Sequence, residues 1–465
     1  MAAGFLQRER IVAPPGWSRW LIPPAALSIH LAIGQAYAWS VFKTPLESTL
    51  LEGNPSAGVL SALPFTLGII MLGLSAALFG TKVDANGPRW AMVVSMICFV
   101  SGFLISAAGT ALGQYWLVIV GYGFVGGIGL GIGYISPVST LIKWFPDRPG
   151  LATGIAIMGF GGGALIASPL TTQLLGAFGG SGPEAASGGI AQTFLVMGLI
   201  YAVFMSVGWL LIRVPAEGWK PSGWEPARAK AGSLISTANV SAANAIKTPQ
   251  FWLLWVVLCF NVTAGIGILE KASPIYQDFF PDASAPAALA AAAGGFVAIL
   301  SLANAIGRIL WSSVSDLVGR KNMYRLYLGA GALLYLAVTL TTNTNKVVFL
   351  ICALFILSFY GAGFATVPAY LRDLFGTYQV GAIHGRLLTA WSTAGVLGPV
   401  IVNAVADAQI AAGVSGPGRY TLAFSIMIGL LVIGFVCNEL IRPVNARFHE
   451  PAAAAPATTT AGAHA

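Results

Sequence analysis

The chain has 465 residues, of which 56% are hydrophobic and only 9% are charged, whereas soluble globular chains are about 25% charged. A mean hydropathy of +0.79 indicates a membrane protein, and the net charge of +8 comes from short basic clusters between apolar segments, not from one nucleic-acid-binding run. The four cysteines lie apart inside apolar segments, which argues against disulfides and cysteine metal sites.

Twelve apolar segments are long enough to cross a bilayer as helices. They cover residues 20–42, 57–80, 90–112, 115–139, 150–175, 190–212, 251–270, 288–312, 325–342, 347–370, 386–406 and 420–441. They lack the alternation of a membrane barrel, so we expect an all-α membrane protein. The first segment is too long for a cleavable signal and is predicted to be the first span.

A polar stretch in the middle of the chain separates six spans from six. The predicted divisions are a cytoplasmic N-terminus (1–18), a six-helix bundle (19–213), a central cytoplasmic loop (214–249), a second six-helix bundle (250–443) and a disordered cytoplasmic tail (444–465). The Gly- and Ser-rich segment 176–189 predicts a flexible outer loop.

The basic residues predict the orientation of the chain in the membrane. With the N-terminus inside, 19 of the 24 Lys and Arg residues fall on the cytoplasmic side and four fall outside. The remaining one, Arg308, lies within the eighth span. We therefore expect both termini in the cytoplasm and the protein in the bacterial inner membrane.

Each half carries a similar turn between its second and third spans. The sequences are GTKVDANGPR and SSVSDLVGRK, which share Asp84, Gly87 and Arg89 in the first half and Asp316, Gly319 and Arg320 in the second. An aspartate at a helix end can pair with a neighbouring arginine, and glycine permits the tight turn. The repeat resembles the signature loop of the major facilitator superfamily, in which two bundles rock about a central site. Two independent turns are the alternative.

Nothing in the sequence suggests an enzyme, a cofactor or a metal site, because no catalytic set or cofactor loop is recognisable. The glycine-rich run GFGGGALIASP (159–169) follows no strand, so a phosphate loop is disfavoured. Small residues there are expected to let helices approach closely.

Arg308 is the sharpest single feature of the sequence. It lies eight residues before Asp316, about 12 Å into its helix. A charge in the hydrocarbon costs at least about 2.5–3.5 kcal/mol, so it is kept for a partner or a function. No Asp or Glu falls at mid-depth in any predicted span, which favours an anion site. The alternative is an arginine that reaches the cytoplasmic face or bonds to carbonyls.

Other polar or aromatic side chains in the spans are candidates to line a cavity. Asn304 lies one turn from Arg308, and the others are Tyr37, Tyr134, Tyr360, Trp391 and, with less support, Asn261. The alternative is that the aromatic residues anchor the spans at the membrane interface and that the asparagines hydrogen-bond between helices. Trp39, Trp252 and Trp255 are expected in the interfacial belt. His30 is a candidate proton site, because imidazole titrates near neutral pH.

Several segments are specific enough to suggest a family. AYAWSVFKTPLE, KWFPDRPGLATGIAIMGFGGG and LSLANAIGRILWSSVSDLVGRKNMY resemble the oxalate/formate antiporter family, whose bacterial members include carriers of lactate and pyruvate. The resemblance implies that Arg308 is the carboxylate ligand and that Asn304 matches the lactate-carrier branch. It also implies that Tyr37, Tyr134 and Tyr360 line the cavity.

One position departs from the oxalate carrier, which has a second buried cation, a lysine, in span 11. Here the region reads RLLTAWSTAGVLGP, with Trp391 or a neighbour at that place and Arg386 at the cytoplasmic edge. A dianion facing a single arginine would be only half compensated in low dielectric. This departure favours a monocarboxylate.

The sequence therefore predicts a secondary transporter of small monocarboxylates such as lactate or pyruvate, coupled to protons and monomeric in the bilayer. An oxalate/formate-type anion exchanger would need a second cation in the cavity. A drug efflux transporter would need a wide apolar cavity and an acidic membrane residue. A membrane sensor would need an output domain.

Overall fold

The computed structural model describes residues 3–179, 183–225, 234–236, 238–281, 284, 286–340 and 346–451. In these ranges the chain is helical apart from loops and two isolated bridges. Eleven helices are long and apolar enough to cross a membrane. A twelfth span results if the pair Arg19–Ala38 and Ser40–Glu47, bent by 41°, counts as one. The predicted all-α membrane fold is confirmed.

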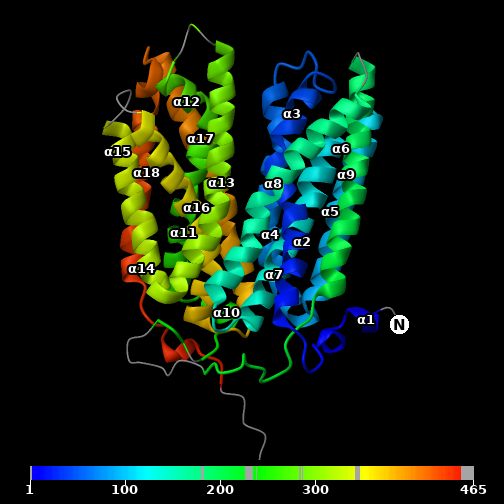
Figure 1. Ribbon diagram of the computed structural model, residues 1–465, viewed down its shortest axis with the longest axis vertical. Coiled ribbons are helices and arrows are strands. Elements are labelled where there is room, and N and C mark those ends of the chain that lie inside the picture. The colour runs from blue at the N-terminus through cyan, green and yellow to red at the C-terminus, as the bar shows by residue number, and fades with distance from the viewer. Residues whose placement is uncertain are drawn as a thin grey trace, which may run out of the picture.

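The spans gather into two bundles, which Figure 1 shows side by side. The first contains α1 (Ala3–Leu6), α2 (Ile22–Ile33), α3 (Ser40–Glu47), α4 (Ala57–Asn86), α5 (Pro88–Ala111), α6 (Tyr115–Val118), α7 (Gly127–Trp144), α8 (Pro149–Phe178) and α9 (Pro183–Leu211). The second contains α11 (Pro249–Glu270), α12 (Ala272–Phe279), α13 (Pro286–Val318), α14 (Arg320–Arg325), α15 (Gly331–Leu340), α16 (Lys346–Phe375), α17 (Val380–Ala411) and α18 (Thr421–Leu440), with the short α10 (Ala242–Ala245) before it.

The first span is broken in its middle, where the sequence alone predicts a continuous helix. The 3-10 segment η3 (Gly34–Ala38) separates α2 from α3. Gly34 lies so close to the Phe160 backbone that a Cβ atom would collide with its carbonyl. This close approach packs the break against α8. The fourth and ninth spans contain π-helical stretches, η4 (Ile119–Gly126) and η5 (Leu326–Ala330).

Most helices extend beyond the apolar segments from which they were predicted. α4 continues to Asn86, α13 to Val318 and α16 to Phe375. Backbone hydrogen bonding does not stop at the edge of the hydrocarbon, so polar residues continue the helix. The expected loop at 176–189 is mostly helical, because α8 ends at Phe178 and α9 begins at Pro183; residues 180–182 lie outside the described residues.

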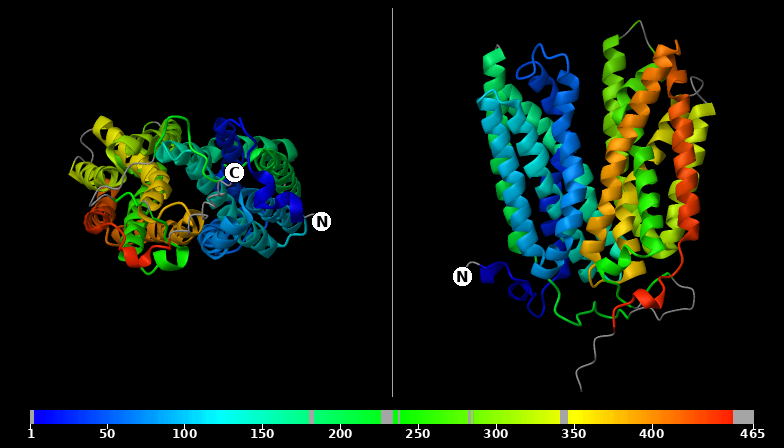
Figure 2. Two further views of the ribbon diagram at one scale, coloured as in Figure 1. Left: turned by 90° about the horizontal axis from the view of Figure 1, so that it is seen from below. Right: turned by 180° about the vertical axis from the view of Figure 1, so that it is seen from behind.

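The two bundles meet at one end and diverge at the other (Figures 1 and 2). We call the end where they meet the terminal end, because α1, close to the N-terminus, lies there together with α10. Contact between the bundles runs mainly through two helix pairs, α4 with α17 and α8 with α13. Each pair joins a helix of one bundle to a helix of the other, so these pairs determine how the halves are held.

Glycines permit the close approach of these crossing pairs. A Cβ atom on Gly80 of α4 would lie 2.7 Å from the Ala382 Cα atom of α17. On α8, a Cβ atom at Gly154 would lie 2.6 Å from the Arg308 carbonyl oxygen of α13. The glycine-rich run 159–169 belongs to α8. A Cβ atom on its Gly163 would come within 2.6 Å of the Gly34 backbone, at the end of α2. The run thus serves close helix packing, as its composition predicts.

The chain segments at the terminal end are tied to the bundles by backbone hydrogen bonds. Val214, after α9, exchanges bonds of 2.9 Å with Ile11 and Ala13 near the N-terminus. Glu450 donates its amide to the Asn239 carbonyl of the central loop at 2.8 Å. The tail predicted to be disordered from residue 444 is therefore ordered up to residue 451, because it pairs with this loop. Residues 452–465, and 226–233 and 237 of the loop, lie outside the described residues.

Candidate functional site

The turn between α4 and α5 joins the two bundles through its aspartate. Gly87 adopts a φ of 91°, which favours glycine, and ends α4. The Asp84 carboxylate accepts a 2.8 Å hydrogen bond from the Ala382 amide at the start of α17, and Lys143 lies 3.9 Å away. We call Asp84, Lys143 and Ala382 the Asp84 junction. A carboxylate at a helix N-terminus is stabilised by free amides and by the helix dipole.

The expected pairing of Asp84 with Arg89 is wrong. Arg89 donates instead to the carbonyls of Trp209 (3.1 Å) and Leu210 (3.5 Å) at the end of α9, and its guanidinium packs on the Phe5 ring of α1. Gly87, with its positive φ, and Pro88 at the start of α5 turn the chain before Arg89, and this arginine faces its own bundle. It serves the internal packing of the first bundle.

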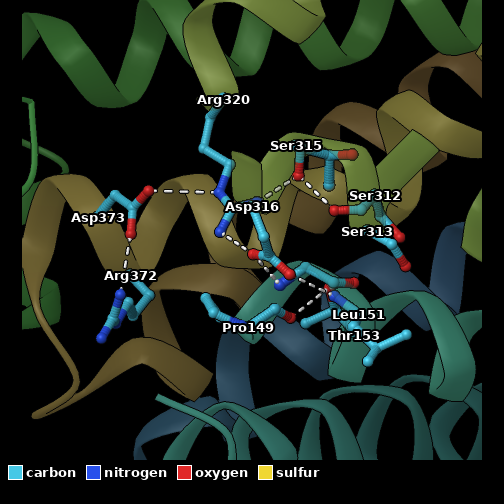
Figure 3. Close-up of polar contacts among 12 residues, drawn as sticks. Pro149, Leu151, Thr153, Ser312, Ser313, Ser315, Asp316, Arg320, Arg372 and Asp373 are labelled. Carbon is cyan, nitrogen blue, oxygen red and sulfur yellow. Dashed lines mark hydrogen bonds and ion pairs between the residues drawn. The ribbon is translucent and has the colours of Figure 1, made fainter. Parts of the chain in front are cut away.

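The equivalent turn after α13 makes a denser contact (Figure 3). Asp316 accepts hydrogen bonds of 2.9 Å from both the Gly150 and the Leu151 amides at the start of α8. Arg320, one helical turn on, donates to the same carboxylate at 2.5 Å, so the expected pairing of these two residues is confirmed. Gly319 again has a φ of 91°.

Arg320 extends this contact into a chain of charges (Figure 3). Its Nε atom lies 3.3 Å from the Asp373 carboxylate near the end of α16. Arg372 contacts Asp373 at 3.2 Å and donates to the Pro146 carbonyl of the first bundle at 3.2 Å. We call Asp316, Arg320, Asp373, Arg372 and the two amides of α8 the Asp316 junction. The two junctions are related by the repeat and close the terminal end.

Arg308 lies between the two bundles, further from the terminal end than the Asp316 junction. It is 1% exposed, so it does not reach an aqueous surface. Its Nε donates to Asn304 Oδ1 at 2.8 Å, and its Nη1 donates to the Ile157 carbonyl of α8 at 2.9 Å. Bonding to a carbonyl is thus part of its environment, and the carbonyl belongs to the opposite bundle. No carboxylate pairs with Arg308 among the described residues.

Glycines make room for this guanidinium. A Cβ atom on Gly161 of α8 would lie 2.7 Å from Arg308 Cζ, and one on Gly361 would lie 3.1 Å from Arg308 Cγ. The Phe364 ring lies 5.5 Å from the guanidinium carbon, within cation–π range. The arginine is therefore packed against both bundles.

Of the predicted cavity aromatics, Tyr134, Tyr360 and Trp391 are buried around this arginine and Tyr37 is partly buried. Arg308 is within electrostatic reach of the Tyr134 and Tyr360 phenols, and Tyr360 is in turn within reach of Tyr37 and Trp391. The three hydroxyls and the Trp391 indole N–H make no hydrogen bond of normal geometry with the protein. Buried donors usually find partners. We call these residues, with Asn304, Arg308 and Phe364, the Arg308 site.

Two aromatic residues of this region were not singled out from the sequence. Phe160 of α8 contacts the Tyr37 and Tyr134 rings at 5.2 and 5.3 Å, and Phe364 stacks on Trp391 at 5.6 Å. Phe364 lies four residues after Tyr360, so helical spacing offered a signal. From sequence alone, a phenylalanine that lines a site cannot otherwise be told from one that packs in the core of an apolar span.

His30 lies beside the Arg308 site and does not reach into it. Its Nε2 atom is 3.2 Å from the Tyr134 carbonyl, and its ring centroid is 5.3 Å from that of Tyr134. His384 of α17 packs on the Tyr134 ring at 5.6 Å. His384 was not singled out from the sequence, where it lies near the edge of the eleventh span.

The remaining polar and aromatic candidates divide between packing and the surface. Asn261 is buried against Gly363, and its Oδ1 atom has no hydrogen-bond partner. Trp39 is not an interfacial residue: it is buried and donates to the Ser61 carbonyl at 2.8 Å, because the break in span 1 turns it inward. Trp252 is exposed, and Trp255 donates to the Thr389 hydroxyl at 2.9 Å.

Comparisons with known proteins agree with this architecture. The chain resembles solved structures of FucP, a Major Facilitator Superfamily transporter, in the outward conformation (TM-score 0.62, 17% identity, 90% of this chain and 99% of that one). It also resembles a bacterial homologue of the iron transporter ferroportin in an outward-facing state (TM-score 0.63, 14% identity, 90% and 98%). At these identities the likeness shows the fold.

Relatives in sequence confirm the resemblance drawn from the motifs. The chain is 27% identical to the oxalate:formate antiporter of Oxalobacter formigenes, over 84% of this chain and 85% of that protein. It is 25% identical to apicoplast pyruvate carrier 1 of Toxoplasma gondii, over 74% and 69%. The model of the Major Facilitator Superfamily matches residues 25–399. The chain therefore belongs to the Major Facilitator Superfamily and is a multi-pass membrane transporter, not an enzyme.

Proposed function

We propose that the protein carries small monocarboxylates of the lactate or pyruvate type across the inner membrane, with a proton, by alternating access about the Arg308 site. The observation that carries this proposal is the buried Arg308 guanidinium, which lacks a carboxylate partner among the described residues and lies near the buried hydroxyls of Tyr134 and Tyr360. A guanidinium fork and nearby hydroxyls are the groups that bind a carboxylate.

The charge of the site supports one carboxylate rather than two. Arg308 supplies the single positive charge of the Arg308 site, whose other side chains are neutral. The Trp391 indole N–H can donate a hydrogen bond, but it cannot compensate a second negative charge. A dianion would leave one charge uncompensated in low dielectric, which is costly.

The position of Arg308 between the bundles supports a role in alternating access. Its bond to the Ile157 carbonyl joins α13 to α8. A substrate carboxylate that accepts a hydrogen bond from Arg308 Nη1 would compete with the Ile157 carbonyl. Substrate binding would therefore weaken the contact between α13 and α8. Substrate can move a two-state equilibrium only through such a difference in contacts.

Several accompanying features are part of the same proposal. The basic residues support cytoplasmic termini, so the terminal end would face the cytoplasm and the junctions would close that side. The proposed divisions remain residues 1–18, 19–213, 214–249, 250–443 and 444–465, with a monomer as the working unit. The likeness to the oxalate:formate antiporter keeps anion exchange as the second candidate.

The test is transport in proteoliposomes loaded with unlabelled substrate. The protein should exchange labelled lactate or pyruvate and should discriminate against oxalate. Arg308→Lys keeps the charge and removes the planar fork, and loss of a charge-assisted hydrogen bond of about 1.5–3 kcal/mol predicts exchange about 10- to 100-fold slower. Arg419→Lys is the matched control, because Arg419 contacts Asp278 at 3.2 Å outside this site. Normal exchange by Arg308→Lys, or a preference for oxalate, would refute the proposal.

A further inference from the structure

His384 is a buried histidine to which the proposed function of the Arg308 site gives no role. It lies in the first turns of α17 and is 1% exposed. Neither of its ring nitrogens has a hydrogen-bond partner. A neutral imidazole carries one donor and one acceptor, and leaving either of them buried without a partner costs free energy. An ionisable side chain that bears this cost inside a membrane protein is expected to have a function.

Along α17, His384 lies between the terminal end and the Arg308 site. Ala382, two residues earlier, belongs to the Asp84 junction, and Trp391, seven residues later and about 10 Å along the helix, belongs to the Arg308 site. The imidazole packs on the Tyr134 ring, which comes from the opposite bundle. Separation of the bundles at the terminal end would therefore break this contact and expose the ring.

Most charged side chains near this end of α17 already have partners. Asp84 of α4 binds the Ala382 amide and lies near Lys143 of α7, Asp373 of α16 pairs with Arg320, and Arg386 of α17 donates to the Ala242 carbonyl. The remaining titratable neighbours are Tyr134 of α7, whose ring packs on His384, and His30 of α2, which packs on the same Tyr134 ring. No acidic side chain among the described residues is paired with His384.

The two histidines that flank Tyr134 differ in how they hold a proton. His30 Nε2 faces the Tyr134 carbonyl at 3.2 Å, which fixes a proton on that nitrogen. A second proton there would add a charge within electrostatic reach of Arg308. His384 has no such fixed bond, and the one titratable side chain whose charge acts on it is His30. His30 Nδ1 also lacks a partner, so each ring has a free nitrogen that could take a proton. The two histidines differ in that the Arg308 charge opposes a second proton on His30 and is not among the charges that act on His384.

We propose that His384, rather than His30, is the proton-binding residue that couples transport to the pH gradient. The proposal rests on the proposed function of the Arg308 site. A neutral imidazole nitrogen takes a proton from water on one side, becomes imidazolium in the loaded carrier, and returns the proton to water when the terminal end opens. No other bond forms or breaks.

Charge balance explains why such a residue couples the two fluxes. The empty carrier holds the single positive charge of Arg308. The loaded carrier holds Arg308, one carboxylate and one imidazolium, which again sum to a single positive charge. A bound carboxylate cancels the arginine charge and so favours protonation nearby, and by linkage the proton favours the carboxylate. Both conformational steps then move the same charge, so the cycle is electroneutral.

The experiment compares His384→Gln and His384→Asn with the parent in proteoliposomes. Two assays are run: exchange of labelled lactate against internal lactate, and accumulation of lactate driven by a pH gradient. Exchange needs only the loaded carrier and should be retained. Accumulation driven by the pH gradient should be lost, and net uptake should instead respond to an imposed inside-positive membrane potential. His30→Gln is the matched control and should keep pH-driven accumulation.

Three results would overturn the proposal. The first is pH-driven accumulation by both His384 variants at the level of the parent. The second is loss of exchange together with accumulation in both variants, which would make His384 a substrate-binding or packing residue. The third is a parent that exchanges lactate but ignores the pH gradient. A parent that exchanges no monocarboxylate would refute the proposed function itself.

Discussion

The two junctions at the terminal end come from the same repeated motif but are built differently. At the Asp84 junction, one carboxylate accepts one amide of α17 and has a lysine 3.9 Å away. At the Asp316 junction, the carboxylate accepts two amides of α8, and Arg320 ties it at 2.5 Å to a second aspartate. In both halves, therefore, an aspartate binds the N-terminus of a helix of the other bundle. The cationic side chain beside that aspartate differs between the halves.

The two junctions differ because Arg89, after Gly87, and Arg320, after Gly319, have different partners. Arg320 pairs with two carboxylates of its own bundle, one of which, Asp316, binds amides of the other bundle. Arg89 instead donates to carbonyls of its own bundle and contacts neither Asp84 nor α17. A carboxylate with a close counter-ion and two amide donors is better compensated than one with a single amide. We therefore expect the Asp316 junction to contribute more of the free energy that keeps the terminal end closed.

The largest effect should come from Arg320→Ala, which leaves both Asp316 and Asp373 buried without their shared cation. Breaking a buried pair costs about 3–5 kcal/mol, enough to reverse most two-state equilibria. Spin labels at exposed Asn86 and Tyr378 in a cysteine-free background should report a longer distance between the bundles. Arg89→Ala is the matched control. It should lower the melting temperature in detergent and leave that distance unchanged. An equal opening by both variants would contradict the proposed division of roles.

The next effect separates the two aspartates. Asp316→Ala removes two charge-assisted hydrogen bonds that cross between the bundles, besides the one from Arg320 within its own bundle, so it should weaken closure by about 3 kcal/mol or more. Asp84→Ala removes one bond between the bundles, for about 1.5–3 kcal/mol. The same spin-label distance, measured for both variants at equal temperature, gives the fraction of open molecules. If Asp84→Ala opens the terminal end as much as Asp316→Ala, the two junctions are equivalent despite their different charges.

The smallest effect concerns the pair that positions the turn before α8. Arg19 donates to Asp147 at 2.6 and 3.0 Å. Burial alone would raise the pKa of Asp147, but the Arg19 guanidinium more than offsets it and holds the pKa below its usual range. The pair therefore stabilises the protein above the ordinary carboxyl pKa of about 4 and loses this contribution as the pH falls through the lowered value.

Asp147→Asn tests this pair by melting temperature in detergent. The difference between the variant and the parent should be constant from about pH 7 to about pH 5 and should shrink only below about pH 4. Arg19→Gln should show the same pH dependence, because it removes the same pair. A difference that already disappears near pH 6 would assign the effect to another group.

The apolar segments, the repeated turn and Arg308 were all visible in the sequence, because each depends on local composition or spacing. Spans need about 20 apolar residues, and a lone arginine at mid-depth is conspicuous. The direction of Arg89 was not visible, since it depends on where the end of α9 packs. The burial of Trp39 was missed for a similar reason: it depends on the break in span 1, which packs against Phe160 of α8.

The sequence by itself determined that this is an all-helical membrane transporter of two related halves with one arginine at mid-depth. These properties follow from residue types and spacing along the chain. The tertiary structure decided which amides Asp84 and Asp316 bind, that Arg308 reaches the Ile157 carbonyl, and that His384 meets Tyr134 from the opposite bundle. Such contacts join residues more than 130 positions apart, so they depend on how the helices cross and not on any local pattern.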